Sequence, residues 1–246
     1  MLSTRSINAF AFIGMTLIPL SSLAADPELG FSGSGEAGYS SSTGNTTTTS
    51  AIGAIKMNYN QISSELKSIL EVNYKSENDV QTQERYFLDL QRNQFYDENR
   101  SYYSFIGGQF ENSRFEEIDL DATLSLGLGK RLYHTDSTTL TAEIGLGFQS
   151  TTLTSAAGGK TTDQTIGRLK LDFNHKINEM VTFSQDALLL AGSDRTKLEA
   201  NTGFKVKVAD NMNVKASYKY RYNDNPATAS IKKTDTQTNL TLIYDF

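Results

Sequence analysis

Long stretches of the chain alternate strictly between apolar and polar residues, and this pattern constrains the fold more than any other feature. From 118 to 129, isoleucine, leucine and alanine occupy every second position, with aspartate, threonine, serine and glycine between them. Because a β-strand sends successive side chains to opposite faces, each stretch predicts a strand with one apolar and one polar face. Similar stretches cover 140–149, 168–174, 197–208, 212–223 and the carboxy-terminal 238–246.

Weaker versions of the pattern in the amino-terminal half raise the predicted total to twelve strands. They cover 31–39, 51–59, 66–74 and 86–90. Residues 100–111 and 180–191 also predict strands, but adjacent apolar residues leave open which side chains share a face there. No helical period is apparent after the first 25 residues. The sequence therefore predicts an all-β protein.

The first 24 residues predict a cleaved signal peptide. Arg5 supplies a positive charge, 9–20 are apolar, and Ser22 and Ala24 provide small residues at a cleavage site, with cleavage after Ala25 as an alternative. The apolar run is too short for a membrane-spanning helix, which needs about 20 residues. We expect removal of 1–24 and a single barrel domain over 25–246.

Alternation alone does not say whether the apolar face meets lipid or a protein core, since soluble sandwiches and lipocalin-like barrels alternate too. Three features favour lipid. The clearest predicted strands, 118–129, 140–149, 197–208 and 212–223, run for ten residues or more, against about 5–6 in soluble proteins. Their number is even, and the last strand ends on the aromatic Phe246. In lipid every backbone group must be paired, so the prediction is a closed antiparallel transmembrane barrel.

The connections predict how the barrel is oriented. Tight connections at 59–61, 134–136, 178–179 and 209–211 alternate with looser ones at 41–46, 111–117, 150–163 and 223–234. Short periplasmic turns and longer outer loops are typical of outer-membrane barrels. We therefore expect both termini to be periplasmic, in the outer membrane of a Gram-negative bacterium.

Composition excludes several classes of function. The formal net charge is −5 and there are no cysteines. This mild acidity indicates no nucleic-acid partner, and the lack of thiols excludes a disulfide framework and thiolate metal sites. His134 and His175 fall on the expected periplasmic rim, and no phosphate-binding or hydrolase motif is present. We expect no enzyme activity, cofactor or metal.

The polar faces predict a charged lumen. A cation-rich wall from the later strands would face a partly acidic wall from the earlier ones. The candidate lumen residues are Lys197, Lys205, Lys207, Lys215, Lys219, Arg221, Arg168, Lys170, Asp119, Asp121 and Glu143. Asp119 and Asp121, two residues apart, could also hold a cation as a pair.

The carboxy-terminal residues resemble the β-signal that directs bacterial outer-membrane proteins to their assembly machinery. Phe246, Tyr244, Leu242 and Leu240 share one face, although Thr241 stands where many such signals have glycine. The opening segment 35–39, followed by Ser-Thr-Gly-Asn-Thr at 42–46, resembles the YdiY-like family of salt-induced outer-membrane proteins. That family has no settled molecular function, so the resemblance implies only fold, location and partners: outer-membrane lipid, assembly machinery and periplasmic chaperones.

Two functions remain open from the sequence. One is a narrow channel whose charged lumen selects small ions or polar solutes. The other is a non-conducting structural or osmotic-stress envelope protein, because opposite charges can pair and fill a small barrel.

Overall fold

The computed structural model describes residues 29–42 and 47–246. The expected signal peptide, 1–24, lies outside the described residues. Two single-turn 3-10 helices, η1 (Arg114–Glu116) and η2 (Ser155–Ala157), interrupt an otherwise all-β chain, and no helix in these ranges is long and apolar enough to cross a membrane. The strands are β1 (Gly30–Ser42), β2 (Thr48–Asn60), β3 (Ser64–Glu77), β4 (Val80–Phe95), β5 (Tyr102–Ser113), β6 (Ile118–His134), β7 (Thr138–Leu153), β8 (Thr161–Lys176), β9 (Val181–Gly192), β10 (Thr196–Ala209), β11 (Met212–Asn223) and β12 (Thr234–Asp245).

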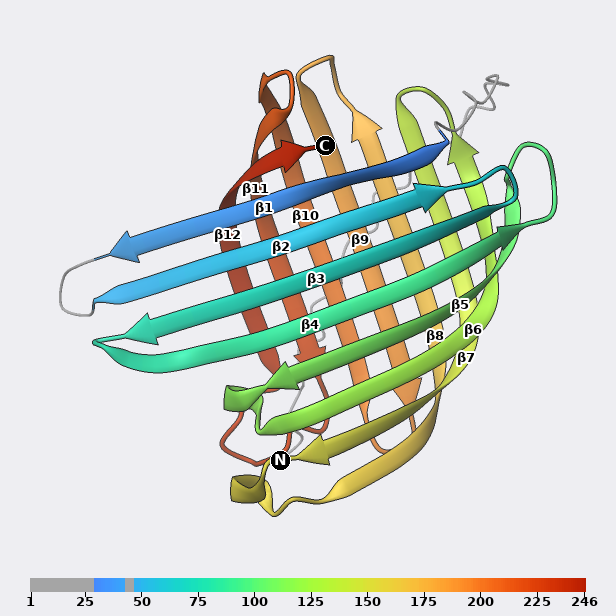
Figure 1. Ribbon diagram of the computed structural model, residues 1–246. Helices are drawn as coiled ribbons and strands as arrows, with labels where there is room; N and C mark the ends of the chain where they lie inside the picture. The colour runs from blue at the N-terminus through green and yellow to red at the C-terminus, as the bar shows by residue number, and fades with distance from the viewer. Residues whose placement is uncertain (1–28, 43–46) are drawn as a thin grey trace, which may run out of the picture.

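The twelve strands form one closed barrel in which each strand pairs antiparallel with its sequence neighbours and β1 pairs with β12 (Figure 1). The predicted fold class and strand number are therefore confirmed. The alternating pattern explains this arrangement. A sheet with one apolar and one polar face separates an apolar exterior from a polar interior only when its first and last strands pair and close it.

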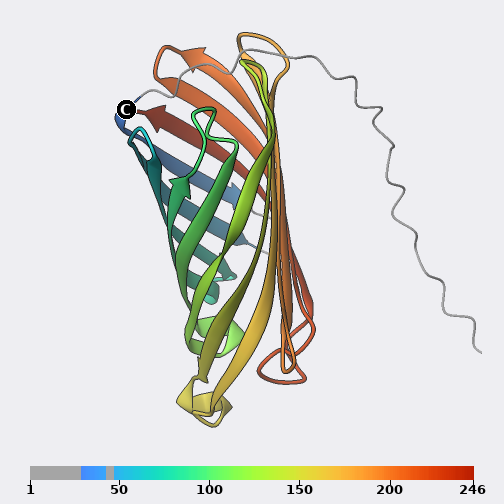
Figure 2. The same cartoon turned by 90° about the vertical axis from the view of Figure 1, so that its right-hand side faces the viewer.

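The two ends of the barrel differ. Gly30 and Phe246 lie at the same end, which we call the terminal end, together with the connections 61–63, 96–101, 135–137, 177–180 and 210–211. The opposite end, the loop end, carries η1, η2 and the longest described connection, 224–233 (Figure 2). The expected alternation of short and long connections holds on average, although the loop end also contains the two-residue turn at 78–79.

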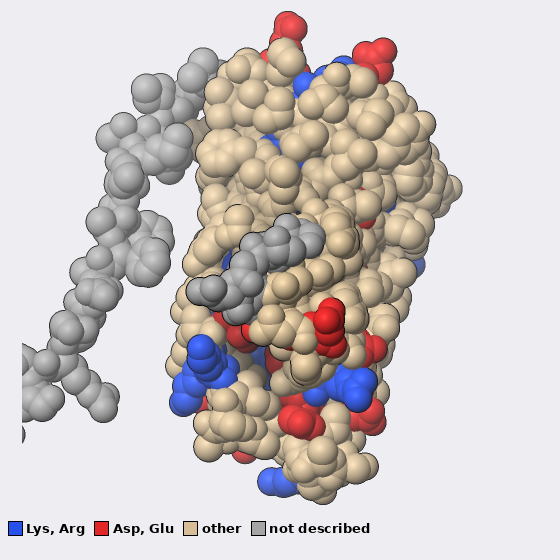
Figure 3. Space-filling model, turned by 90° about the vertical axis from the view of Figure 1, so that its left-hand side faces the viewer, with Lys and Arg blue, Asp and Glu red and all other residues tan. Residues whose placement is uncertain are grey.

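The outside of the barrel is apolar. Leucine, isoleucine and phenylalanine side chains of the clearest alternating strands are exposed, including Leu124, Leu126, Ile144 and Leu146. On the face shown in Figure 3, charged side chains gather at the ends, most of them at the loop end, and are sparse between. An apolar surface of this extent is costly in water and matches the apolar band of a membrane barrel.

The sequence left open which side chains of β5 and β9 face the lumen, because adjacent residues in both strands are apolar. The structure shows which ones do. In β5, Tyr103 and Phe105 are buried in the lumen, whereas Tyr102 and Ile106 are exposed outside. In β9, Leu188 pairs with Glu199 and Leu190 pairs with Lys197, so both leucines share the inner face.

Glycines of the neighbouring strand β6 make room for the two lumen aromatics of β5. A Cβ atom at Gly127 would lie 2.8 Å from the Phe105 ring, and one at Gly129 would overlap the Tyr103 ring. An aromatic ring lying over a strand glycine is a device that fixes the register of a sheet.

Replacing Gly129 with alanine should lower the free energy of unfolding by about 1–3 kcal/mol, the usual cost of overpacking. The new methyl group would displace Tyr103, whose hydroxyl donates a hydrogen bond to Glu143 (2.7 Å). Urea unfolding of the barrel in detergent would measure the change. Gly53→Ala is the matched control, since a Cβ there meets no atom within 4 Å; equal losses in both variants would contradict the packing explanation.

The seam between β1 and β12 is the shortest strand pairing of the barrel. It has four register pairs, from Ser34 with Asp245 to Ala37 with Leu242, whereas every other neighbouring pair of described strands has at least eleven. Two hydrogen bonds between the backbones of Gly33 and Phe246, both 2.8 Å, extend it at the terminal end. Toward the loop end the two strands diverge (Figure 1).

Candidate functional site

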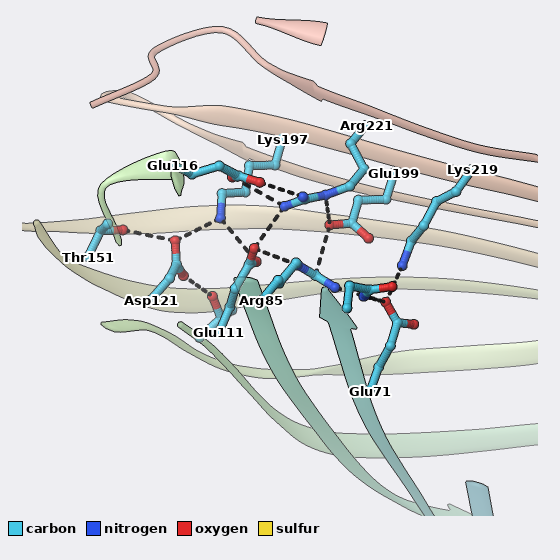
Figure 4. A network of polar contacts seen from close by, with 12 residues as sticks. Glu71, Arg85, Glu111, Glu116, Asp121, Thr151, Lys197, Glu199, Lys219 and Arg221 are labelled. Carbon is cyan, nitrogen blue, oxygen red and sulfur yellow. Dashed lines mark hydrogen bonds and ion pairs between the residues drawn. The ribbon is translucent and has the colours of Figure 1, made fainter. Parts of the chain in front are cut away.

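A network of charged side chains crosses the lumen in its loop-end half (Figure 4). At its centre is Arg85 of β4, of which only 1% is exposed. Its guanidinium donates hydrogen bonds to Glu111 of β5 (2.8 Å) and Glu71 of β3 (3.0 Å). A cation this deeply buried is tolerated only with close anionic partners, so these carboxylates fix its position.

Arg221 of β11 approaches Glu111 from the opposite wall of the barrel. Its guanidinium donates to Glu111 (2.8 Å) and to Glu199 of β10 (3.2 Å). It also donates to Glu116 of η1 (2.5 Å), so the first loop-end helix is tied to the far wall. Glu111 thus accepts from two arginines on opposite sides of the barrel, which brings those walls together.

Lysines of the same wall complete the network, which we call the loop-end network. Lys219 of β11 donates to Glu71 (2.9 Å), and Lys197 of β10 donates to Asp121 of β6 (2.8 Å). Asp121 also accepts from Gln149 and Thr151 of β7 (2.9 and 3.1 Å). The basic wall predicted from the later strands therefore faces the acidic wall and pairs with it.

A second group lies closer to the terminal end. Glu143 of β7 accepts hydrogen bonds from Arg168 of β8 (2.6 Å), Tyr103 (2.7 Å) and Gln91 of β4 (2.8 Å). Arg168 also donates to Gln91 (3.0 Å) and lies over the Phe105 ring, 4.4 Å from its centroid. These contacts join β4 and β5 to β7 and β8 through the lumen.

Two cavities flank these groups. The loop-end cavity, about 310 Å³, lies among Glu116, Lys219, Arg221 and the first residues of β12. The terminal-end cavity, about 240 Å³, lies between β3 on one side and β6, β7 and β8 on the other. A smaller space of about 30 Å³ lies beside Glu111, Asp121 and Lys197, and we call it the narrow part of the lumen.

The predicted lumen residues occupy several places. Lys197, Lys219, Arg221 and Asp121 belong to the loop-end network, whereas Arg168 and Glu143 form the second group. The others lie apart from these two groups: Lys215 pairs with Glu36 at the seam (3.1 Å), Lys170 lines the terminal-end cavity, and Lys205 and Lys207 lie near Asp245 and Asp210 (3.9 and 3.7 Å).

Asp119 differs from the expectation. The alternation placed it in the lumen beside Asp121, but its side chain is exposed, whereas Ile118 is 1% exposed. The cause is a pair of register shifts, because β6 is irregular against both β5 and β7 at this point. Asp119 and Asp121 therefore do not form a carboxylate pair for a cation, and no group of three or more His, Asp or Glu side chains in the described ranges is placed to hold a metal.

The histidines lie at the terminal end, as their sequence positions indicated. The Nδ1 atom of His175 is 2.8 Å from the hydroxyl of Thr138, and His134 lines the terminal-end cavity.

Sequence reasoning missed several central residues. Arg85, Glu111 and Glu116 were not among the predicted lumen residues, although Arg85 directly precedes the alternating stretch 86–90, in which Tyr86, Leu88 and Leu90 form the apolar face, and so falls on the polar face. Glu111 had no such signal, since the orientation of its strand was open. No pattern in the sequence indicates that η1 places Glu116 against Arg221.

Twelve antiparallel strands closed around a charged lumen, with an apolar exterior, are the architecture of outer-membrane β-barrels. The chain belongs to the family described as "Protein of unknown function, DUF481", whose pattern matches residues 35–246. It is similar in structure to the COG4313 outer membrane channel from Pseudomonas putida F1, with 9% identity, a TM-score of 0.54, and coverage of 94% of this chain and 100% of that one.

A second similar structure is the NanC porin, with 10% identity, a TM-score of 0.53, and coverage of 86% of this chain and 98% of that one. At such low identities the likeness shows the fold alone. No curated protein matches this chain in sequence.

Proposed function

We propose that this protein is a barrel of the Gram-negative outer membrane that acts as a narrow passive channel for small ions and polar solutes. The apolar exterior and the likeness to an outer-membrane channel and a porin support this location. We place the terminal end in the periplasm and the loop end outside, since longer outer loops are typical of such barrels. Assembly would then require periplasmic chaperones and the outer-membrane assembly machinery.

The observation that carries the proposal is the composition of the narrow part of the lumen. Its lining combines four charged side chains with a few apolar ones: Glu111, Asp121, Lys197 and Glu199, with Phe87, Leu188 and Leu190. Arg221 has three carboxylate partners, Glu111, Glu116 and Glu199. A side chain with several alternative partners can exchange them, so a small ion could replace one partner at a time as it passes. Such a constriction selects by charge and size.

Replacing Arg221 with glutamine should raise single-channel conductance and shift selectivity toward cations. The substitution removes the guanidinium that joins η1 to the barrel wall and leaves Glu111 and Glu116 with less positive charge nearby. Planar bilayers under a salt gradient measure both conductance and reversal potential. Lys160→Gln, in the exposed connection between β7 and β8, is a control with the same charge change and should behave as the wild type.

The alternative is a non-conducting envelope protein, which the burial of Arg85 and the pairing across the lumen favour. A structural role in osmotic or salt stress would fit it, although only the sequence resemblance suggests that role. Folded wild type and Arg221→Gln that are both silent in bilayers would support this alternative and rule out the channel.

We also propose that the protein is not an enzyme. In the described ranges the two histidines lie at the terminal end, away from the charged network in the loop-end half. The polar groups of the network are engaged with one another in ion pairs and hydrogen bonds.

A further inference from the structure

The terminal-end cavity has the size of a binding site for a small solute. Its volume of about 240 Å³ compares with about 30 Å³ for one water molecule in the liquid. It lies on the terminal side of the group formed by Glu143, Arg168 and Gln91, so a solute crossing the barrel would meet it before or after the narrow part.

Cations approach this cavity from three strands. Lys67 comes from β3, Arg131 from β6 and Lys170 from β8. Lys67 and Arg131 share a single carboxylate, Glu65, at 3.5 and 3.6 Å. Lys170 makes no ion pair within 4.0 Å in the described ranges, although Glu143 of β7 lies directly opposite it in register, and Glu143 is itself paired with Arg168. Lys170 is therefore able to take an added anion.

Two carboxylates, Glu143 and Asp172, line the same cavity. Glu143 is already paired with Arg168 (2.6 Å). Asp172 accepts a hydrogen bond from Asn174 (2.7 Å) and has no cation within pairing distance in the described chain. A carboxylate such as that of Asp172 has further lone pairs that accept hydrogen bonds from hydroxyl groups. Thr139 and Thr141 add neutral hydroxyls to the same wall.

We propose that the terminal-end cavity binds a small hydroxylated organic anion. Its carboxylate or phosphate pairs with Lys170 and Arg131, and its hydroxyl groups donate to Asp172 and interact with the threonines. A charge-assisted hydrogen bond holds the anionic group, and the neutral and acidic groups distinguish a hydroxylated solute from a simple anion. The inference names a solute class for the proposed channel and rests on that function for its physiological meaning.

Isothermal titration of the folded, detergent-solubilised barrel with gluconate tests the site directly. Gluconate should bind, and neutral glucose should bind much more weakly. Lys170→Gln should weaken gluconate binding about tenfold, as expected for the loss of one charge-assisted bond. Lys160→Gln, far from the cavity, should leave it unchanged. Inorganic phosphate and glucose 6-phosphate, titrated in parallel, show whether a phosphate serves as well as a carboxylate and whether hydroxyl groups add affinity.

A second variant tests the role assigned to Asp172. Asp172→Asn should reduce the preference for gluconate over acetate, which lacks hydroxyl groups. Equal gluconate affinity in the wild type and Lys170→Gln, or equal binding of glucose and gluconate, would overturn the proposal. Titration measures binding whether or not the barrel conducts. Gluconate binding by a barrel that is silent in bilayers would contradict the channel and support the binding site. Conductance without gluconate binding would contradict only the binding site.

Discussion

Replacing Phe246 with serine should remove most of the folded barrel from the outer membrane. The Phe246 ring stacks on Phe31 of β1 with centroids 6.2 Å apart, and it covers Gly33, where a Cβ atom would lie only 2.7 Å from the ring. Its backbone also exchanges two hydrogen bonds with Gly33. The substitution would therefore weaken the strand pairing that closes the barrel and remove the last residue of the expected assembly signal.

The fraction of folded protein in isolated outer membranes, measured by gel mobility without heating, quantifies this effect. Phe148→Ser is the matched control, because Phe148 is 52% exposed and Phe246 is 53% exposed. Phe148 lies within β7, far from the chain end. If both variants lose the same fraction of folded barrel, the defect comes from lost contact with lipid, and Phe246 has no special role in assembly.

Replacing Glu111 with glutamine should lower the free energy of unfolding by about 3–5 kcal/mol, the usual cost of removing one partner from a buried ion pair. Glu111 accepts from Arg85 and Arg221, both at 2.8 Å, and lies 3.7 Å from Lys197. Without its charge, three cations remain close together in the lumen. Urea unfolding of the barrel in detergent or lipid vesicles measures the change, provided that the dependence on urea concentration keeps its slope.

Glu77→Gln provides the control for this experiment. Glu77 also has a close partner, Lys75 at 2.6 Å, but both side chains are about two-fifths exposed. Exposed pairs contribute about 0–1 kcal/mol at most, and solvent screens this one further. A loss from Glu111→Gln as small as that from Glu77→Gln would show that water fills the lumen and screens the network.

The alternation of residues was sufficient to predict much of the barrel. Leu124, Leu126 and Leu128 point outward because they alternate with small polar residues and glycine, and the strand turns that other face to the lumen. The same logic placed Lys197 and Arg221 inside. These are local properties of one strand, so they can be read from a short segment of sequence.

Other features depend on contacts between distant segments and could not be predicted. Tyr103 faces inward because Gly129 of β6 leaves room for its ring, which the sequence of β5 alone does not reveal. A local irregularity in β6 moved Asp119 out of the lumen and Ile118 into it. The pairing of Arg221 with Glu111 requires strand registers around the barrel, and a one-residue slip in any of them would separate these side chains.

The short seam has a consequence for how the cylinder is held together. Joining β1 to β12 connects the two ends of the barrel sequence, the closure with the largest loss of chain entropy. The backbone contributes only four register pairs to it. Side chains add to these backbone contacts: Glu36 of β1 pairs with Lys215 of β11 (3.1 Å), beyond β12, and with Lys56 of the neighbouring strand β2 (2.6 Å). One carboxylate inside the barrel thus links strands from the beginning and the end of the chain, because Glu36 joins β1 to β2 on one side and, past β12, to β11 on the other.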